Sequence, residues 1–251
     1  MPSLCFCMPA HGRLRLAQIC MRQLRRTCDA LCAEGIEASA IVVACDENLD
    51  VARALGFGTV ERDNAYLARK FNDALQLALD PSHNLRPFTH AVPVGSDDFV
   101  DYRLFLDLPT TDTVVGFQRL AVVREDGREI TCRQLNYTGG AGIRIYPAAL
   151  MAPFGYRPAD PDRKRACDTS ILTNLVRHHG PRMRVEHRHL HDFQIVDWKS
   201  PGEQLNTYAE IASVFRAAVT ADPFDALDGV YPAEALDEMR ALYAAREQVA
   251  A

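Results

Sequence analysis

The strongest candidates for a functional site are the residues of the acidic turn Ser96-Asp97-Asp98, which follows the apolar segment 89–94. Carboxylates are hard oxygen ligands, and they suit a divalent cation that also binds water and substrate phosphates. On its own, an Asp pair is more typical of a solvated turn that caps the next element. The position after a strand, with Gly95 permitting close backbone approach, favours a metal site that holds a nucleotide diphosphate.

Basic and polar residues in two other segments suit the same ligand. Pro9, His11 and Arg13 follow the first apolar run, and Lys70 and Asn72 lie in the amphipathic stretch before the acidic turn. Arg13 and Lys70 could contact a phosphate, and His11 a base or phosphate. Asn72 could bond a base, a ribose or a nearby loop. Without a ligand, the first group would be an ordinary loop between a strand and a helix, and the second would be a solvated helix face.

Two segments in the second half suit an acceptor. The small residues Gly139-Gly140-Ala141-Gly142 suggest close approach of backbone to a ligand, although they match neither a Walker loop nor a dinucleotide fingerprint. Asp168 opens a predicted helix, where an Asp is usually a cap. If it faces a cleft, it can deprotonate an acceptor hydroxyl as a general base.

A histidine run and a late lysine complete the candidates. His187, His189 and His191 alternate, so they share one face of a predicted strand. One of them could complete a metal site with Asp98, whereas a zinc site of all three is strained because alternate residues lie roughly 6.5–7 Å apart along a strand. Lys199 follows the next strand and could hold a diphosphate, or could be solvated.

These residues need a scaffold, and the first hundred residues alternate short apolar runs with amphipathic stretches. This β-α-β order predicts a parallel sheet. The later segments predict a hairpin around Asp126-Gly127 and further helices. We expect strands at 4–9, 38–45, 59–61, 89–94, 113–124, 128–134, 143–146 and 182–198, and helices at 13–34, 50–55, 66–79, from 147, 167–178, 205–219 and 232–248.

The composition is that of a globular protein, with 251 residues, 48% hydrophobic and 24% charged. A net charge of −5 disfavours a globally basic nucleic-acid binder. The eight cysteines include no CxxC pair, and Cys5, Cys7 and Cys45 fall in apolar runs. We therefore expect buried free thiols and a cytoplasmic protein. The short apolar start indicates a strand and not a signal peptide, and no run approaches the ~20 residues of a membrane span.

Taken in order, these features resemble the GT-A glycosyltransferases. The likeness covers roughly residues 4–210, and its end is similar to small phage and bacterial glycosyltransferase-like proteins. It is carried by 4–9 and 41–47 as the first two strands, Ser96-Asp97-Asp98 as the acidic motif, 139–142, Asp168 at a helix start, and Asp197-Trp198-Lys199-Ser200 with Asn206-Thr207-Tyr208.

The resemblance implies an α/β fold with a mainly parallel, mixed sheet flanked by helices. It divides the chain into a catalytic domain, 1–202, and C-terminal helices, 203–251, packed on the same domain. Residues 1–100 form the nucleotide-binding half and 101–202 the acceptor half. It also implies a nucleotide-sugar donor, a UDP-sugar above all, and Mn²⁺ or Mg²⁺ as cofactor.

The resemblance also distributes roles among the residues. Asp98 and His191 would bind the metal, with His189 as the alternative to His191. Asp168 would be the catalytic base if the reaction inverts the anomeric centre. The donor side would comprise Pro9, His11, Arg13, Asp46, Lys70, Asn72, Ser96, Asp97 and Lys199, with Ser96 standing where the family has an acidic residue, and the acceptor side Gly140, Ala141 and Gly142.

The acceptor is open at this stage. Residues 157–191 carry eight Arg and Lys against four Asp and Glu, which suits a polyanion such as DNA with a hydroxylated base, as phage glycosyltransferases modify. A basic rim for the donor diphosphate explains the same residues. Two further functions remain, a nucleotidyltransferase on a related fold and a non-catalytic nucleotide-sugar-binding protein.

Overall fold

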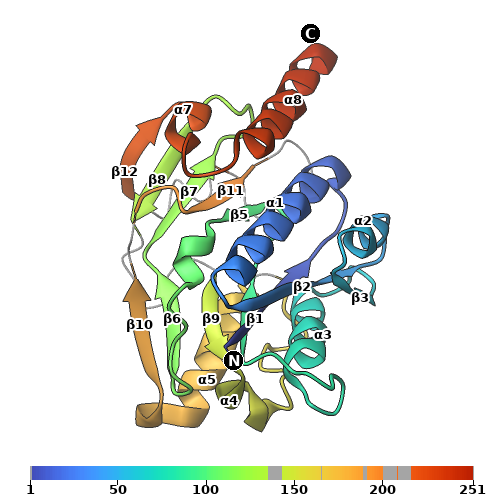
Figure 1. Cartoon of the computed structure of the whole chain (residues 1–251), viewed down its shortest axis with the longest axis vertical. Coiled ribbons are helices and arrows are strands. Elements are labelled where there is room, and N and C mark those ends of the chain that lie inside the picture. Colours follow the sequence, from blue (N-terminus) through green and yellow to red (C-terminus); the bar gives the residue numbers. More distant parts are fainter. Residues whose placement is uncertain are drawn as a thin grey trace.

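The computed structural model describes residues 2–134, 143–164, 166–188, 191–199, 208 and 216–250, without the side chains of 216–219 and 246–250. Its described strands form two sheets (Figure 1). The seven-stranded sheet has the order β10-β6-β9-β4-β1-β2-β3, and the five-stranded sheet has the order β12-β8-β7-β11-β5.

The first half builds the parallel part of the larger sheet. β1 (Ser3–Pro9) lies between β2 (Glu37–Ala44) and β4 (His90–Pro93), and β3 (Gly58–Glu61) extends the sheet beyond β2. All of these pairs are parallel. The carboxyl ends of the strands therefore meet at one edge, where ligands bind in such sheets.

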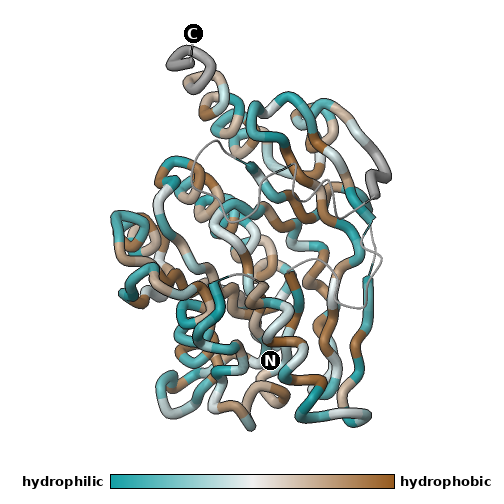
Figure 2. The backbone as a smooth tube through the Cα atoms, turned by 180° about the vertical axis from the view of Figure 1, so that it is seen from behind, coloured by the Kyte–Doolittle hydropathy of each residue, from teal (hydrophilic) through white to brown (hydrophobic). Residues whose placement is uncertain are grey.

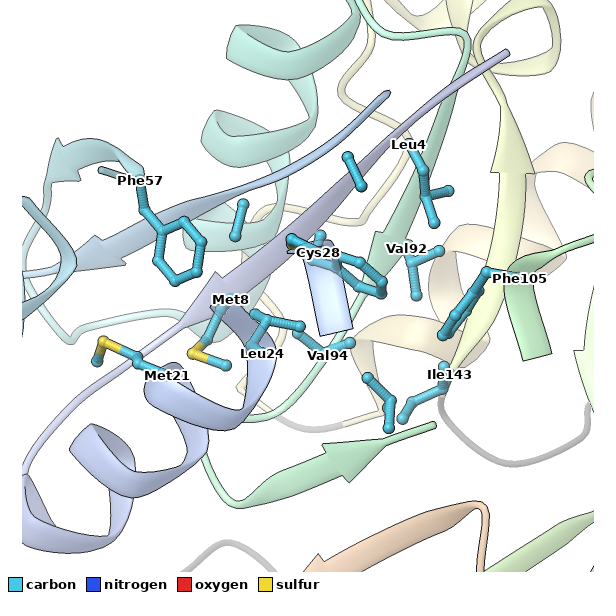
Figure 3. Packing of buried hydrophobic residues seen from close by; sticks show 14 of the residues in the cluster. Leu4, Met8, Met21, Leu24, Cys28, Phe57, Val92, Val94, Phe105 and Ile143 are labelled. Atoms are coloured by element: carbon cyan, nitrogen blue, oxygen red, sulfur yellow. The ribbon is translucent and has the colours of Figure 1, made fainter. Parts of the chain in front are cut away.

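Helices cover both faces of this sheet. Alternate β1 side chains Leu4, Phe6 and Met8 pack with α1 (Leu14–Ala33) and α2 (Asn48–Ala54) in the cluster that Figure 3 shows. The intervening Cys5 and Cys7 face α3 (Leu67–Leu79) and α5 (Cys167–His179) on the other side. A strand that is buried on both faces needs a continuous apolar run, which explains the composition of β1.

The second half extends the larger sheet. β9 (Arg144–Pro147) pairs antiparallel with β4 and with β6 (Thr113–Phe117), and β10 (Arg184–Arg188) lies parallel to β6. α4 (Ala148–Met151) follows β9. Short 3₁₀ helices span Tyr102–Phe105, Ala152–Phe154 and Gly180–Arg182.

The smaller sheet comprises β5 (Asp98–Val100), β7 (Arg119–Val123), β8 (Ile130–Gln134), β11 (Ile195–Trp198) and β12 (Arg216–Ala221). β7 and β8 form the predicted hairpin, whose turn has Gly127 at φ 70°.

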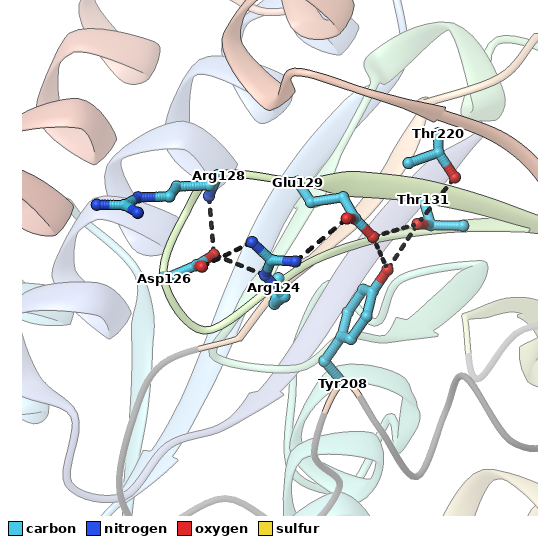
Figure 4. A network of polar contacts seen from close by, with 7 residues as sticks. All are labelled: Arg124, Asp126, Arg128, Glu129, Thr131, Tyr208 and Thr220. Atoms are coloured by element: carbon cyan, nitrogen blue, oxygen red, sulfur yellow. Dashed lines mark hydrogen bonds and ion pairs between the residues drawn. The ribbon is translucent and has the colours of Figure 1, made fainter.

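Polar contacts join residues of this hairpin to Tyr208 (Figure 4). Tyr208 donates a hydrogen bond to Glu129 and contacts Thr131. Arg124 pairs with Asp126 and Glu129.

Two C-terminal helices, α7 (Pro223–Leu227) and α8 (Ala233–Ala250), follow β12. They share a hydrophobic cluster with the start of α1 and with β5, β7 and β11, centred on the fully buried Trp198. In Figure 2 hydrophobic residues are frequent along the inner strands, and hydrophilic residues are frequent in the outer helices and loops. Within the described ranges, no helix combines the length and apolar character needed to cross a membrane.

The structure confirms the predicted fold class, a mixed and mainly parallel sheet flanked by helices. Of the helix predicted at 205–219, the described Tyr208 is helical, but the prediction is wrong over 216–219, because Arg216–Ala221 is β12 and pairs antiparallel with β8. Alanine favours helix locally, but the ladder offered by β8 overrides that weak preference. The expectation of a buried Cys45 is also wrong, since this free thiol is exposed at the end of β2.

Candidate functional site

The acidic turn lies where the two sheets meet. β4 ends at Pro93, Gly95-Ser96-Asp97 form the turn, and Asp98 begins β5. β11 pairs antiparallel with β5 so that Asp197 stands directly opposite Asp98. This register brings together carboxylates that are almost one hundred residues apart in the sequence.

Three carboxylates form a possible metal site within the described part of the chain. Asp97, Asp98 and Asp197 each offer an oxygen, and these oxygens lie within 4.8 Å of one another. Asp197 is only 8% exposed, and among the described residues its Oδ1 atom has no hydrogen-bond partner. A buried acceptor without a partner is costly, and a divalent cation would satisfy it. The residues therefore fit Mn²⁺ or Mg²⁺.

Two basic side chains contact the same carboxylates. Arg13 Nη1 lies 2.7 Å from Asp97 Oδ2, and its Nη2 donates a hydrogen bond to Ser96 Oγ at 3.3 Å. Lys199 Nζ lies 2.5 Å from Asp197 Oδ2 and 3.7 Å from Asp97 Oδ2. Lys199 is 3% exposed, so its charge is held inside the site.

The charges give the three carboxyls different pKa values. Burial would raise the pKa of Asp97, but Arg13 and Lys199 outweigh it and hold that pKa below its usual value. Burial, followed by repulsion from Asp197 and Asp97, raises the pKa of Asp98 well above its usual value. Burial, partly offset by Lys199, raises the pKa of Asp197 to about 6. Protons and a metal ion therefore compete for Asp98 and Asp197.

Gly95 leaves room for two of these carboxylates. A Cβ atom on Gly95 would lie 2.7 Å from Asp97 Oδ1 and 2.8 Å from Asp98 Oδ2. The Gly95 N–H also donates to Asp98 Oδ2 at 2.6 Å. The backbone thus approaches the acidic group more closely than any residue with a side chain allows.

We expect Gly95→Ala to weaken Mn²⁺ binding at least about tenfold and to lower stability by about 1–3 kcal/mol, because both carboxylates must move. Titration calorimetry and thermal denaturation measure the two effects. Gly116→Ala in β6 is the matched control, since its Cβ would meet its nearest atom, His187 Nδ1, at 3.4 Å, an ordinary contact. Equal Mn²⁺ affinities in both variants and the parent protein would contradict the role of Gly95.

A cavity of about 480 Å³ adjoins the acidic group. Its floor includes Lys70, which is 1% exposed and donates to the Ala10 carbonyl at 2.8 Å and to Asn64 Oδ1 at 2.9 Å. The lining residues are Pro9, Ala10, His11, Gly12, Arg13, Asn64, Ala65, Leu67, Lys70, Ser96 and Lys164.

Asp46 supports one wall of this cavity. Its Oδ2 accepts the Gly12 N–H at 2.9 Å, and its Oδ1 accepts the Asn48 backbone and side-chain N–H groups at 3.1 and 2.7 Å. Gly12 and Arg13 adopt left-handed φ angles of 57° and 43°. The hydrogen bond to Asp46 holds this turn so that Arg13 reaches the acidic group.

Most of the predicted donor-side residues meet at this edge of the sheet. Pro9, His11, Arg13, Lys70 and Ser96 line the cavity, and Asp97 and Lys199 lie in the adjoining acidic group.

Asn72 has a different environment from the predicted donor contact. It is 2% exposed, and its side chain exchanges two hydrogen bonds with the Ala159 backbone at 2.8 and 2.9 Å. It fastens α3 to the loop before α5 and is not among the residues that line the described cavity. Its amide groups are therefore committed to the fold.

The predicted base Asp168 lies in the first turn of α5 and is paired with a buried arginine. Arg144 Nη1 in β9 lies 3.1 Å from Asp168 Oδ2, and the Arg144 side chain is 1% exposed against 25% for Asp168. The register of β9 with β4 and β6 places Arg144 towards the same edge as the end of β4. The Asp168 carboxylate is thus oriented by Arg144 and still accessible.

The other predicted site residues do not belong to the acidic group. His191 is exposed and its backbone N–H donates to Gln194 Oε1, while His187 lies in β10 beside Gly116. Neither belongs to the carboxylate group. His189 and residues 139–142, including Gly140, Ala141 and Gly142, lie outside the described residues.

Sequence reasoning named Asp197 only as part of the segment 197–200 and gave it no role, and it did not single out Lys164. Asp197 and Lys199 are two residues apart at a strand end, so they share a face, and that spacing is a signal that could have linked them. The partner strand could not be identified locally. Lys164 gave no signal, because its place at the cavity depends on the loop that Asn72 fastens.

No protein-family model and no curated protein matches this chain. Solved structures do match. A Drosophila β-1,4-galactosyltransferase 7 variant in complex with manganese, UDP-galactose and xylobiose matches with a TM-score of 0.49 and 11% identity. The match covers 74% of this chain and 65% of the galactosyltransferase, so this chain spans less than two thirds of that protein.

Two further solved structures match at similarly low identity. Glucosyl-3-phosphoglycerate synthase from Mycobacterium tuberculosis, in complex with Mg²⁺ and UDP, matches with a TM-score of 0.48 and 10% identity over 85% of this chain and 75% of that one. 4-Diphosphocytidyl-2C-methyl-D-erythritol synthase from Anaerococcus prevotii matches with a TM-score of 0.45 and 12% identity over 85% and 96%. With identities of 10–12%, the likeness to these solved structures is one of fold alone.

Proposed function

We propose that this protein is a metal-dependent glycosyltransferase that moves a sugar from a nucleotide sugar, a UDP-sugar above all, to a hydroxyl acceptor. The observation that carries the proposal is the three-carboxylate group beside a cavity lined by Arg13 and Lys70. In this group the buried Asp197 Oδ1 has no hydrogen-bond partner within the part of the chain that the structure describes. A nucleoside diphosphate needs both a hard cation for its phosphates and a concave pocket for its base and ribose.

In this proposal Asp98, Asp97 and Asp197 hold Mn²⁺ or Mg²⁺. Asp197 takes the place expected for His191, because Asp197 lies within the carboxylate group. The bound metal would supply neutralisation of the leaving diphosphate. Arg13 and Lys199 would share that negative charge.

The other donor-side residues shape the pocket. Pro9 and His11 bound the cavity, and Lys70 fixes its floor through the Ala10 carbonyl. Asp46 acts one step further back, through its hydrogen bond to Gly12. We therefore assign Asp46 to positioning and not to ligand contact.

Asp168 is the proposed catalytic base on the acceptor side. Its ion pair with Arg144 would orient the carboxylate towards an acceptor hydroxyl. The Asp168 carboxylate would accept the hydroxyl proton, and Arg144 would exchange no proton.

For DNA as acceptor the support is weaker, because several arginines of 157–191 already pair with acidic groups. Arg157 pairs with Asp73, Arg184 with Asp112 and Arg188 with Asp107.

A nucleotide-sugar screen tests the proposal. Thermal denaturation with each donor, with and without Mn²⁺, should reveal a donor that raises Tm only with the metal. That donor is then incubated with hydroxyl acceptors, including an oligonucleotide with a hydroxymethylated base, and products are weighed by mass spectrometry. Release of nucleoside diphosphate with sugar transfer supports the proposal. Pyrophosphate release from a nucleoside triphosphate would identify a nucleotidyltransferase, and binding without turnover a binding protein; either contradicts it.

The raised pKa values predict how metal binding depends on pH. For Asp98 and Asp197 the folded pKa lies above the unfolded value of about 4, so their contribution to stability is present below pH ~4 and is lost as pH rises. Mn²⁺ binds the ionised carboxylates and recovers that loss. With the pKa of Asp197 at about 6, about nine tenths of this group is protonated at pH 5.0.

We therefore expect the increase in Tm caused by Mn²⁺ to be at least about 3 °C larger at pH 7.5 than at pH 5.0. The estimate follows from about tenfold weaker binding and roughly 2–4 °C per kcal/mol for a chain of this size. Asp197→Asn should reduce this pH dependence, because it removes one of the two titrating carboxyls and the repulsion from Asp197 that, after burial, helps to raise the pKa of Asp98. A Mn²⁺-induced shift that is the same at both pH values would show that these carboxyls do not bind the metal.

A further inference from the structure

The side chain of Lys199 contacts two of the three carboxylates of the proposed metal site. Its Nζ atom lies 2.5 Å from Asp197 Oδ2 and 3.7 Å from Asp97 Oδ2. The backbone at Lys199 is fixed, since its N–H donates to the Val123 carbonyl and its carbonyl accepts the Tyr243 hydroxyl at 2.5 Å. The lysine is thus built into the site and is not a surface residue that happens to lie near it.

This lysine and a divalent cation require the same oxygens. A lysine that is 3% exposed needs a negative partner, and the carboxylates of Asp197 and Asp97 provide it. A metal ion bound to those carboxylates would lie close to the ammonium and repel it. Asp197 Oδ1, which has no hydrogen-bond partner among the described residues, is the oxygen that Lys199 leaves to a second cation.

Arg13 does not share this conflict to the same degree. It contacts Asp97 from the α1 side and also donates to Ser96, so it has a partner outside the carboxylate group. The ion pairs of Lys199 with Asp197 and Asp97 both lie within that group. Of the two cations, Lys199 is therefore the one that a metal displaces.

We propose that Lys199 is an internal counter-ion of the three carboxylates, that a divalent cation displaces its ammonium from Asp197 and Asp97, and that the released ammonium then binds the diphosphate. A four-carbon stem allows this movement without a change in the backbone. The last step rests on the proposed function. The competition between Lys199 and the metal does not, because it requires no transfer reaction.

The displacement links metal binding to diphosphate binding. The metal releases the cation that the diphosphate needs, and the diphosphate in turn holds that cation away from the carboxylates. Each ligand therefore raises the affinity for the other by the same factor.

Lys199→Met tests the competition, because methionine has a similar length and no charge. We expect this variant to bind Mn²⁺ at least about tenfold more tightly than the parent protein without nucleotide, by titration calorimetry. With saturating Mn²⁺ it should bind UDP about tenfold more weakly. Mn²⁺ affinity equal to or below that of the parent protein overturns the proposal.

Lys164→Met is the matched control. Lys164 also lines the cavity, but its ammonium lies over the Tyr66 ring, 5.6 Å from the ring centre. It should leave Mn²⁺ affinity unchanged. A tenfold increase in this variant as well would mean that general charge, and not occupation of the site by Lys199, sets the affinity.

A second measurement uses the parent protein alone and so does not depend on folding of a variant. Amine acylation followed by peptide mass spectrometry reports how accessible the Lys199 ammonium is. Labelling of Lys199 should rise severalfold with Mn²⁺ and fall again when UDP is added. Labelling that Mn²⁺ leaves unchanged or reduces overturns the proposal.

The outcomes distinguish this proposal from the proposed function. If sugar transfer fails but Lys199→Met binds Mn²⁺ more tightly and Mn²⁺ increases the labelling of Lys199, the proposed function is wrong and the counter-ion role of Lys199 is supported. If neither Lys199→Met nor the parent protein binds Mn²⁺, both proposals are wrong.

Discussion

Asp98→Asn should abolish Mn²⁺-dependent binding of UDP, with a loss of at least about 100-fold in Mn²⁺ affinity. Changes to residues that merely support a metal ligand cost about 10- to 100-fold, so loss of a ligand should cost at least as much. Asparagine keeps the acceptor for the Gly95 N–H and removes only the charge. Titration calorimetry with Mn²⁺, and with UDP in the presence and absence of Mn²⁺, measures both affinities.

The stability of the same variant separates a lost ligand from a lost fold. Because the pKa of Asp98 is raised in the folded protein, its ionised form lowers the free energy of unfolding at pH 7.5. Asp98→Asn should therefore have an equal or higher Tm without metal. Asp50→Asn, an exposed side chain in a surface pair with Arg53, should change neither quantity. Unchanged metal-dependent UDP affinity in Asp98→Asn would remove Asp98 from the ligand set.

Asp168→Asn should reduce kcat for sugar transfer by about 10²- to 10⁴-fold, the usual contribution of a general base. The amide cannot take a proton from the acceptor hydroxyl. Asp168 is not among the residues that line the described cavity, which we propose binds the donor, so Mn²⁺-dependent UDP binding should stay within about twofold of the parent value. Steady-state kinetics and calorimetry distinguish the two quantities.

The ion pair with Arg144 complicates this substitution. Arg144 is fully buried, whereas a quarter of the Asp168 side chain is exposed, so loss of the carboxylate should lower stability by about 1–3 kcal/mol, less than for a fully buried pair. Kinetics should be measured well below the Tm of the variant. Asp162→Asn, which removes an exposed pair with Arg69 before the same helix, is the control and should retain full activity. A loss of less than tenfold in Asp168→Asn would exclude Asp168 as the base.

The sequence alone was sufficient to predict the parallel strands and helices of the first hundred residues. Apolar runs and three- and four-residue spacings placed β1, β2, β3 and β4 and the helices between them within a few residues. These patterns are local, because burial on a sheet face or helix stripe leaves its period in the sequence. The parallel order then brought Pro9, Asp46 and Ser96 to one edge, which is why most donor-side predictions lie together.

Only the tertiary structure decided which carboxylates meet. Asp197 faces Asp98 because β11 pairs antiparallel with β5 in one particular register, and no local period specifies a partner strand almost one hundred residues away. The same pairing buries Lys199 among the carboxylates, where sequence spacing alone indicated a strand end. Long-range contacts also committed Asn72 to the Ala159 backbone and turned Arg216–Ala221 into a strand. The residue types and their order along the chain thus predict the chemistry, and pairing across the fold decides which side chains carry it.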